Sequence, residues 1–163
     1  MIEDLEELEQ SAEEELKRVD HLIFVTLKYT RTADVIKNTI KRLISAFDFA
    51  TLELLKFAKK KRKIKQISKL ETVRAENLKE VYPETKDFID FYFLLKRIDK
   101  ARSDVREEYR KHMTLIVHLT PEENLEIDME KLKNNPKKTT AVMKCFNFFI
   151  LSNNVMHPYA VII

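Results

Sequence analysis

The 163-residue sequence contains no glycine. Glycine readily takes the positive φ angles that tight hairpin turns and glycine-rich phosphate-binding loops need. Its absence argues against a hairpin-rich β fold and against the nucleotide-binding loops of Rossmann and P-loop proteins. Helices need no glycine in their interior, although their C-terminal caps must then use Asn, Lys or a 3₁₀ turn. The sequence therefore predicts a chain built mainly of helices.

Charge is distributed unevenly along this chain. Charged residues make up 35% of it, and the net charge is +3. Residues 1–16 hold eight acidic side chains and no basic one, so the remainder carries +11. An acidic first turn that complements a helix dipole accounts for part of this excess. An acidic N-terminal helix or arm could also fold onto the basic body or compete with an anionic partner.

Cysteine content and hydropathy predict where the chain resides. A single cysteine, Cys145, excludes an internal disulfide framework, and no Cys or His spacing matches a zinc site. We therefore predict no metal and no cofactor. The acidic N-terminus lacks the apolar core of a signal peptide, and no run of about 18 apolar residues predicts a membrane span. We expect a cytoplasmic protein without a membrane partner.

Apolar residues at three- and four-residue steps predict the helices in the first half of the chain. The first helix is expected from about Ile2 to Thr30. The second begins at Thr32 or Asp34, with Thr32 as N-cap, and extends to Lys63. The segment from Ile67 to Val81 either continues that helix or forms a separate short one, and Tyr82-Pro83 ends it.

The second half is expected to hold one more long helix, from about Glu84 to His112. Residues 113–119 are mainly apolar and β-branched, and residues 120–123 resemble a turn. Apolar and polar residues alternate from 124 to 128, so we expect a two-stranded ribbon or a loop after the helix. Residues 129–134 are expected to form a helical turn and residues 138–153 a final helix rich in aromatic residues. Residues 1–163 are thus predicted to form one domain. Its expected fold class is all-α, an antiparallel four- to five-helix bundle with or without one small β-ribbon near 113–128.

Polar residues replace apolar ones in the stripe that begins at Phe88. Its spacing continues through Arg102, Tyr109 and His112. A guanidinium in such a stripe requires a carboxylate or phosphate partner. One interpretation is structural: Arg102 lies beyond the end of the core or pairs with an acidic residue of a neighbouring helix. The other is functional: the stripe opens onto a polar pocket or a dimer interface, where Arg102 and Tyr109 would contact RNA.

The heptapeptide from Arg106 to His112, Arg-Glu-Glu-Tyr-Arg-Lys-His, fits the Arg-x(4–6)-His pattern of the HEPN superfamily. The chain also resembles that family in placing the pattern late in a long expected helix. HEPN domains are small four- or five-helix bundles, often dimeric, and many are metal-independent endoribonucleases. The resemblance implies a composite site across a homodimer. There His112 would act as general acid or base, and Arg106 would stabilise the phosphate charge.

The sequence departs from the family pattern in one respect. The residue after the arginine is usually Asn, Asp or His, whereas here it is Glu107, whose charge opposes an approaching phosphate. On a regular helix, residues six apart point about 120° away from each other. Arg106 and His112 would therefore converge only where the helix ends or loosens near Lys111.

Two further basic segments are candidate phosphate-binding sites. Tyr29 and Arg31 lie at an expected helix junction, where ordinary helix-cap chemistry is the alternative explanation. The stretch Lys56–Lys65 carries seven positive charges in ten residues. A solvated helix end that complements the helix dipole is the alternative there. Phe57 is the one aromatic residue within this stretch, so sequence-specific single-strand binding is not indicated. The candidate RNA contacts in the stretch are Lys59, Lys60, Arg62 and Lys63.

Two functional hypotheses follow from these patterns. The first is a HEPN-like domain that binds RNA or cleaves it as a metal-independent endoribonuclease, acting as a homodimer. The second is a non-enzymatic helical scaffold or adaptor that binds an acidic or basic protein partner. It would do so through the acidic arm or the aromatic final helix.

Overall fold

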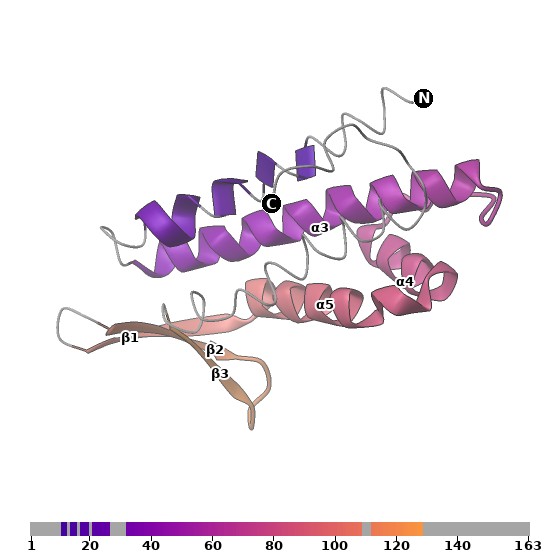
Figure 1. The fold of residues 1–163 in the computed structure, drawn as a ribbon. Helices are drawn as coiled ribbons and strands as arrows, with labels where there is room; N and C mark the ends of the chain where they lie inside the picture. Colours follow the sequence, from indigo (N-terminus) through magenta and orange to yellow (C-terminus); the bar gives the residue numbers. More distant parts are fainter. Residues whose placement is uncertain are drawn as a thin grey trace.

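The computed structural model describes residues 11–12, 14–15, 17–19, 21–26, 32–108 and 112–128, and the fold is given for these residues. Helical residues between 11 and 21 lead into a π-helix, η1, and two long helices then lie side by side with a shorter one between them in sequence (Figure 1). A three-stranded sheet follows at one end. The elements are η1 (Leu22–Thr26), α3 (Ala33–Lys60), α4 (Glu71–Val81), η2 (Pro83–Thr85), α5 (Lys86–Lys100), β1 (Arg102–Glu108), β2 (His112–His118) and β3 (Asn124–Asp128).

Helix α3 is the longest described element and the one on which the others pack. Its 28 residues correspond to a length of about 42 Å at 1.5 Å per residue. Thr32 occupies the N-cap position with an extended backbone, as predicted, although its side chain makes no capping hydrogen bond. The predicted apolar stripe is confirmed as a continuous buried face that includes Ile36, Phe47 and Leu55.

Helices α4 and α5 cover this face of α3. The segment after α3 forms a separate helix, which decides between the two alternatives left open by the sequence. Tyr82 ends α4, and Pro83 begins the single turn of η2 that redirects the chain into α5. Proline suits the first position of such a turn because its missing N–H would have no intrahelical partner there.

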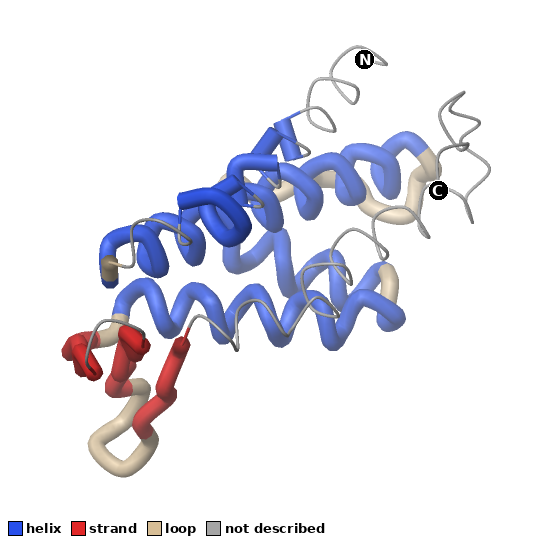
Figure 2. Tube along the Cα trace, turned by 60° about the vertical axis from the view of Figure 1, so that its left-hand side comes forward, coloured by secondary structure: helices blue, strands red, loops and turns tan. Residues whose placement is uncertain are grey.

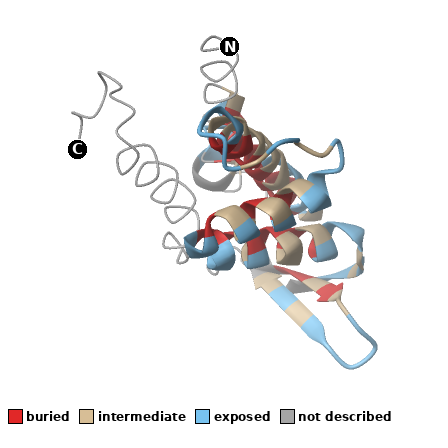
Figure 3. Ribbon diagram, turned by 90° about the vertical axis from the view of Figure 1, so that its right-hand side faces the viewer, coloured by how far each residue is buried: buried red, intermediate tan, exposed pale blue. Residues whose placement is uncertain are grey.

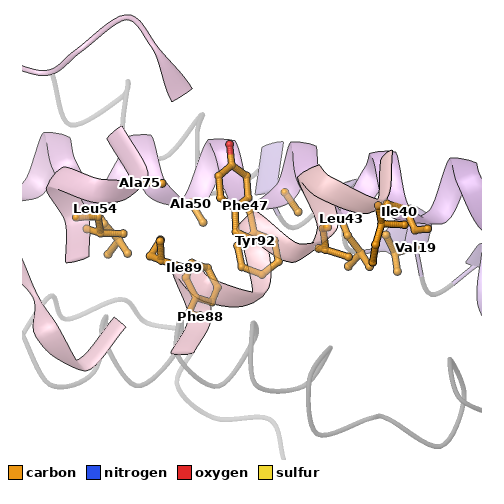
Figure 4. Packing of buried hydrophobic residues seen from close by; sticks show 14 of the residues in the cluster. Val19, Ile40, Leu43, Phe47, Ala50, Leu54, Ala75, Phe88, Ile89 and Tyr92 are labelled. Atoms are coloured by element: carbon orange, nitrogen blue, oxygen red, sulfur yellow. The ribbon is translucent and has the colours of Figure 1, made fainter. Parts of the chain in front are cut away.

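Aromatic rings form the centre of the core between α3 and α5. The ring of Phe47 lies 4.2 Å from that of Phe88 and 5.7 Å from that of Tyr92, measured between centroids. Figure 4 shows these rings with Ile89 among the labelled side chains of the cluster. The Tyr92 hydroxyl donates a 2.5 Å hydrogen bond to Asp48 on α3. Burial raises the pKa of the Asp48 carboxyl, and burial followed by the bond to Asp48 raises the pKa of Tyr92.

The N-terminal helical residues are attached to α3 by a buried carboxylate. Glu15 is 6% exposed and accepts hydrogen bonds from Arg18 and from Arg42 of α3, the latter at 3.1 Å. Val19, one turn further along, is fully buried in the core cluster. One member of the acidic segment 1–16 therefore packs against the body of the molecule.

The three strands form an antiparallel sheet in the order β1-β2-β3, beside the C-terminal end of α5 (Figure 2). Leu115 and Val117 of β2 are buried and join the helical core, with Leu125 and Ile127 of β3 packed against it. Because side chains alternate between the faces of a strand, the residues between these positions form an outer, polar face.

The structure corrects the predicted fold class. The described residues form a mixed α/β arrangement of helices and a three-stranded sheet, and the all-α four- to five-helix bundle is wrong. The helix predicted from Glu84 to His112 ends at Lys100, and β1 begins at Arg102. The ribbon near 113–128 thus acquires a third strand. Pairing with the buried, β-branched β2 outweighs the helix propensity of the Arg and Glu residues in β1.

No helix among the described residues is long and apolar enough to cross a membrane. The predicted helical turn at 129–134 and the final helix at 138–153, with Cys145, lie outside the described part of the chain.

Candidate functional site

A cluster of exposed cations lies where α3 ends and the chain turns towards α4. We call residues 59–69 the basic turn. Between residues 56 and 70 the sequence has eight basic side chains and no acidic one. Figure 3 views the molecule from this end and shows most of the segment as exposed. The exposed cations are Lys59, Lys60, Lys61, Arg62, Lys63, Lys65 and Lys69.

The turn has a defined backbone because α3 ends in a Schellman motif. Arg62 adopts φ 60°, the left-handed conformation that helix ends normally assign to glycine. Its N–H donates to the Lys59 carbonyl, and the Lys63 N–H donates to the Ala58 carbonyl, both at 2.9 Å. A non-glycine residue in this conformation costs roughly 1–2 kcal/mol. Because the chain has no glycine, an arginine occupies this position despite the conformational cost, and it adds a positive charge to the turn.

Two lysines of the turn lie over aromatic rings. Lys63 Nζ is 4.3 Å from the ring centroid of Tyr82, and Lys61 Nζ is 5.4 Å from that of Phe57. Such cation–π contacts contribute about 0.5–1 kcal/mol each at exposed sites. Burial and the nearby charge of Glu84 raise the pKa of the Tyr82 hydroxyl.

The cations of the turn form no ion pairs with the carboxylates that the structure describes. None of the seven forms an ion pair with a described carboxylate, whereas Lys79 pairs with Asp90 at 2.8 Å and Lys96 pairs with Glu71. Unpaired, exposed charges of one sign create a local positive potential that attracts polyanions. The turn therefore has the charge and the exposure needed to contact a phosphate backbone.

A second polar cluster occupies the outer face of the sheet. His118 of β2 bonds Asp104 of β1 through Nε2 at 2.9 Å and Asn124 of β3 through Nδ1 at 2.7 Å. Arg106 of β1 bonds Glu126 of β3 at 3.1 Å. The Arg106–Glu126 bond joins the two edge strands across β2, and the two bonds of His118 join β2 to each edge strand. The bond to Asp104, followed by the bond to Asn124, raises the pKa of His118, and the bond to His118 lowers the pKa of Asp104.

The His118–Asp104 pair makes sheet stability depend on pH. A raised histidine pKa adds stability that is fully present below the unfolded value, about 6.5, and is lost as pH rises through the folded value. A lowered aspartate pKa adds stability that is present above about 4 and is lost as pH falls through the folded value. His118→Gln is therefore expected to lower the urea midpoint more at pH 5.5 than at pH 8.5. The control His21→Gln, at an exposed helical position, should show no such difference, and an equal shift for His118→Gln at both pH values would contradict the prediction.

The structure separates the predicted site residues into two groups. Lys59, Lys60, Arg62 and Lys63 lie together in the basic turn, whereas Arg102 and Arg106 lie on the outer face of the sheet. Arg102 is exposed and pairs in register with His118, so it does not enter a buried stripe. The basic turn lies at the C-terminal end of α3, whereas the sheet lies alongside the N-terminal half of that helix (Figure 1).

Arg106 lies on β1 and His112 on β2, so the helical context predicted for the Arg106–His112 motif is wrong. In the strand register Arg106 is paired with Thr114 and His112 with Glu108. The side chain of His112 lies outside the described part of the structure, as do Tyr109, Tyr29 and Arg31. The composite dimer site therefore stays a prediction.

Sequence reasoning missed several residues of these clusters. Lys61 and Lys65 belong to the basic run but were not among the predicted contacts, and Lys69 joins the turn through the loop that follows. His118 and Asp104 are fourteen residues apart and become neighbours through strand pairing. An alternating pattern of polar residues in 102–106 was the signal that could have placed them on one face.

Neither metal-ligand geometry nor similarity identifies a function for these residues. Within the described ranges, no group of three or more His, Cys, Asp or Glu side chains is arranged to hold a metal ion. No family model, curated protein or solved structure matches the chain. The function is therefore argued from the chemistry of the two clusters.

Proposed function

We propose that this protein binds RNA through the phosphate backbone, using the basic turn. The observation that carries the proposal is the set of seven exposed cations without an ion-pair partner among the described carboxylates. On the outer face of the sheet, by contrast, Arg106 is already bonded to Glu126 and His118 to Asp104. The basic turn therefore supports polyanion binding better than the sheet does.

The arrangement of the cations suits a polymer. They extend from the last turn of α3 through the Schellman motif to Lys69, just before α4. Each cation that neutralises a phosphate releases condensed counterions, so affinity falls as salt rises. A basic turn with several phosphate contacts would bind RNA with little sequence preference and strong salt dependence.

Neutralising two lysines at the helix end tests the proposal. Lys59→Gln combined with Lys60→Gln is expected to weaken binding to RNA about tenfold at 0.1 M salt and to reduce the salt slope by about one to two. Neither lysine lies over an aromatic ring of the residues that the structure describes, unlike Lys61 and Lys63. The measurement is fluorescence anisotropy of a labelled RNA titrated with the full chain at several salt concentrations.

The matched control removes the same charge from the same helix. Lys37 and Lys41 are exposed residues near the start of α3, and changing both to Gln should alter affinity about twofold or less. Equal losses for the two double variants would mean that overall charge, rather than the basic turn, attracts RNA. Tighter binding to phosphatidylserine vesicles than to RNA at the same salt would likewise contradict the proposal and identify a membrane surface as the ligand.

Cleavage of RNA is a separate matter from binding. The pairing of Arg106 with Glu126 places a carboxylate beside the guanidinium that the HEPN resemblance assigns to the phosphate. That arrangement opposes an incoming anion. Catalysis by Arg106 and His112 stays a prediction, and so does the alternative of a non-enzymatic scaffold.

A further inference from the structure

The aromatic rings beside the basic turn are already covered by lysines, which restricts the form of RNA that the turn can bind. We propose that its ligand is double-stranded RNA, bound along its phosphates, rather than single-stranded RNA bound through stacked bases. The inference rests on the proposed function, because it concerns the ligand of the same surface.

Proteins that bind single strands gain much of their affinity from aromatic stacking. Each base stacked on an aromatic side chain contributes about 1–3 kcal/mol. Phe57 is the one aromatic residue between positions 56 and 70, and it is half-buried with Lys61 over its ring. Tyr82, the other ring beside the turn, is 4% exposed and carries Lys63 at 4.3 Å. A base that stacked on either ring would therefore compete with a lysine or with the packing that buries the ring.

A ligand of this surface must therefore gain its affinity from phosphates. A duplex carries about twice as many phosphates per unit length as one of its strands, and each contact releases more counterions from a duplex, about 0.9 compared with about 0.7. RNA duplexes are recognised mostly by shape and by backbone contacts, without unstacked bases.

The fixed backbone of the turn favours the same ligand. Lys59 and Lys60 belong to a regular helix, and Arg62 is held in the left-handed position by the hydrogen bonds of the Schellman motif. A flexible single strand loses conformational freedom when it is ordered on such a fixed set of cations. A rigid duplex binds the same cations without that loss.

Competition between two RNAs tests the inference on the unmodified chain. A labelled RNA duplex is displaced by an unlabelled duplex or by unlabelled polyuridine of the same nucleotide length, at several salt concentrations. We expect the duplex to compete at about fivefold lower concentration or better and to show the steeper salt slope. Equal or better competition by polyuridine would overturn the inference while leaving the proposed function standing. If neither RNA binds, the proposed function fails and the inference fails with it.

A substitution at Phe57 provides a second, independent measurement. Phe57→Leu keeps an apolar side chain where the ring packs but removes its π face. We expect affinity for polyuridine and for the duplex to change by about twofold or less, because no base stacks on this ring. A selective loss of polyuridine binding, in a variant whose thermal unfolding remains cooperative, would overturn the inference.

Discussion

Replacing Phe47 with alanine is expected to lower the free energy of unfolding by about 3–5 kcal/mol. Phe47 is fully buried at the middle of α3, and its ring contacts those of Phe88, Phe91 and Tyr92. Truncation removes the transfer free energy of the ring and leaves a cavity that the long helix cannot collapse to fill. Since most domains are stable by only about 5–15 kcal/mol, much of the population should unfold at moderate urea. Urea titration followed by circular dichroism measures the loss.

A phenylalanine two residues further along the same helix provides the control. Phe49 is half-buried and lies outside the core cluster. Phe49→Ala changes helix propensity by the same amount as Phe47→Ala but removes far less buried surface. A cost for Phe49→Ala equal to that for Phe47→Ala would show that α3 presents a different face to α5.

The corrected fold makes a second strong prediction on β2. Leu115 is 1% exposed and belongs to the core cluster. Leu115→Ala is expected to cost about 2–5 kcal/mol. The free energy of unfolding is again obtained by urea titration, which should show a single transition if the sheet and the helices unfold together.

Its neighbour tests the direction in which the strand faces. Ile116 is paired in register with Asp104 and Glu126 on the outer face of the sheet and is half-buried. Ile116→Ala should therefore cost clearly less than Leu115→Ala, about 1 kcal/mol. The reverse order would mean that the strand is shifted by one residue, which exchanges its two faces.

Periodicity predicted the helical part of the fold because long helices repeat their signal. In α3, apolar residues such as Ile36, Ile40, Leu43 and Phe47 recur at three- and four-residue steps, and the buried face found in the structure follows that stripe. The end of α4 at Tyr82 was predicted equally well, because Pro83 cannot continue a helix.

Periodicity misassigned the segment after Lys100 because an edge strand carries little local signal. Arg102, Arg106 and Glu107 favour helices, and Val105 and Tyr109 continue a near-heptad spacing from α5. The strand forms because β2 offers it an antiparallel partner over seven residues. That pairing is a tertiary interaction, which a local pattern cannot reveal.

The candidate site shows the same contrast between local and distant contacts. The basic turn was predictable because its cations are consecutive in sequence, from Lys59 to Lys63. The conformation of Arg62 was not predictable, since the absence of glycine indicated that some other residue must cap α3 but not which one. The His118–Asp104 contact required knowledge of the strand register.

The basic turn lies at one tip of α3, and this position determines how densely copies of the protein would bind along an RNA. Contact through this tip alone would occupy only a short stretch of a duplex, and with α3 perpendicular to the RNA the helix would extend about 40 Å from it. Many copies could then bind next to one another along one RNA, each with its long axis pointing away from the RNA. In that arrangement the sheet, which lies alongside the N-terminal half of α3 (Figure 1), would be held away from the bound RNA.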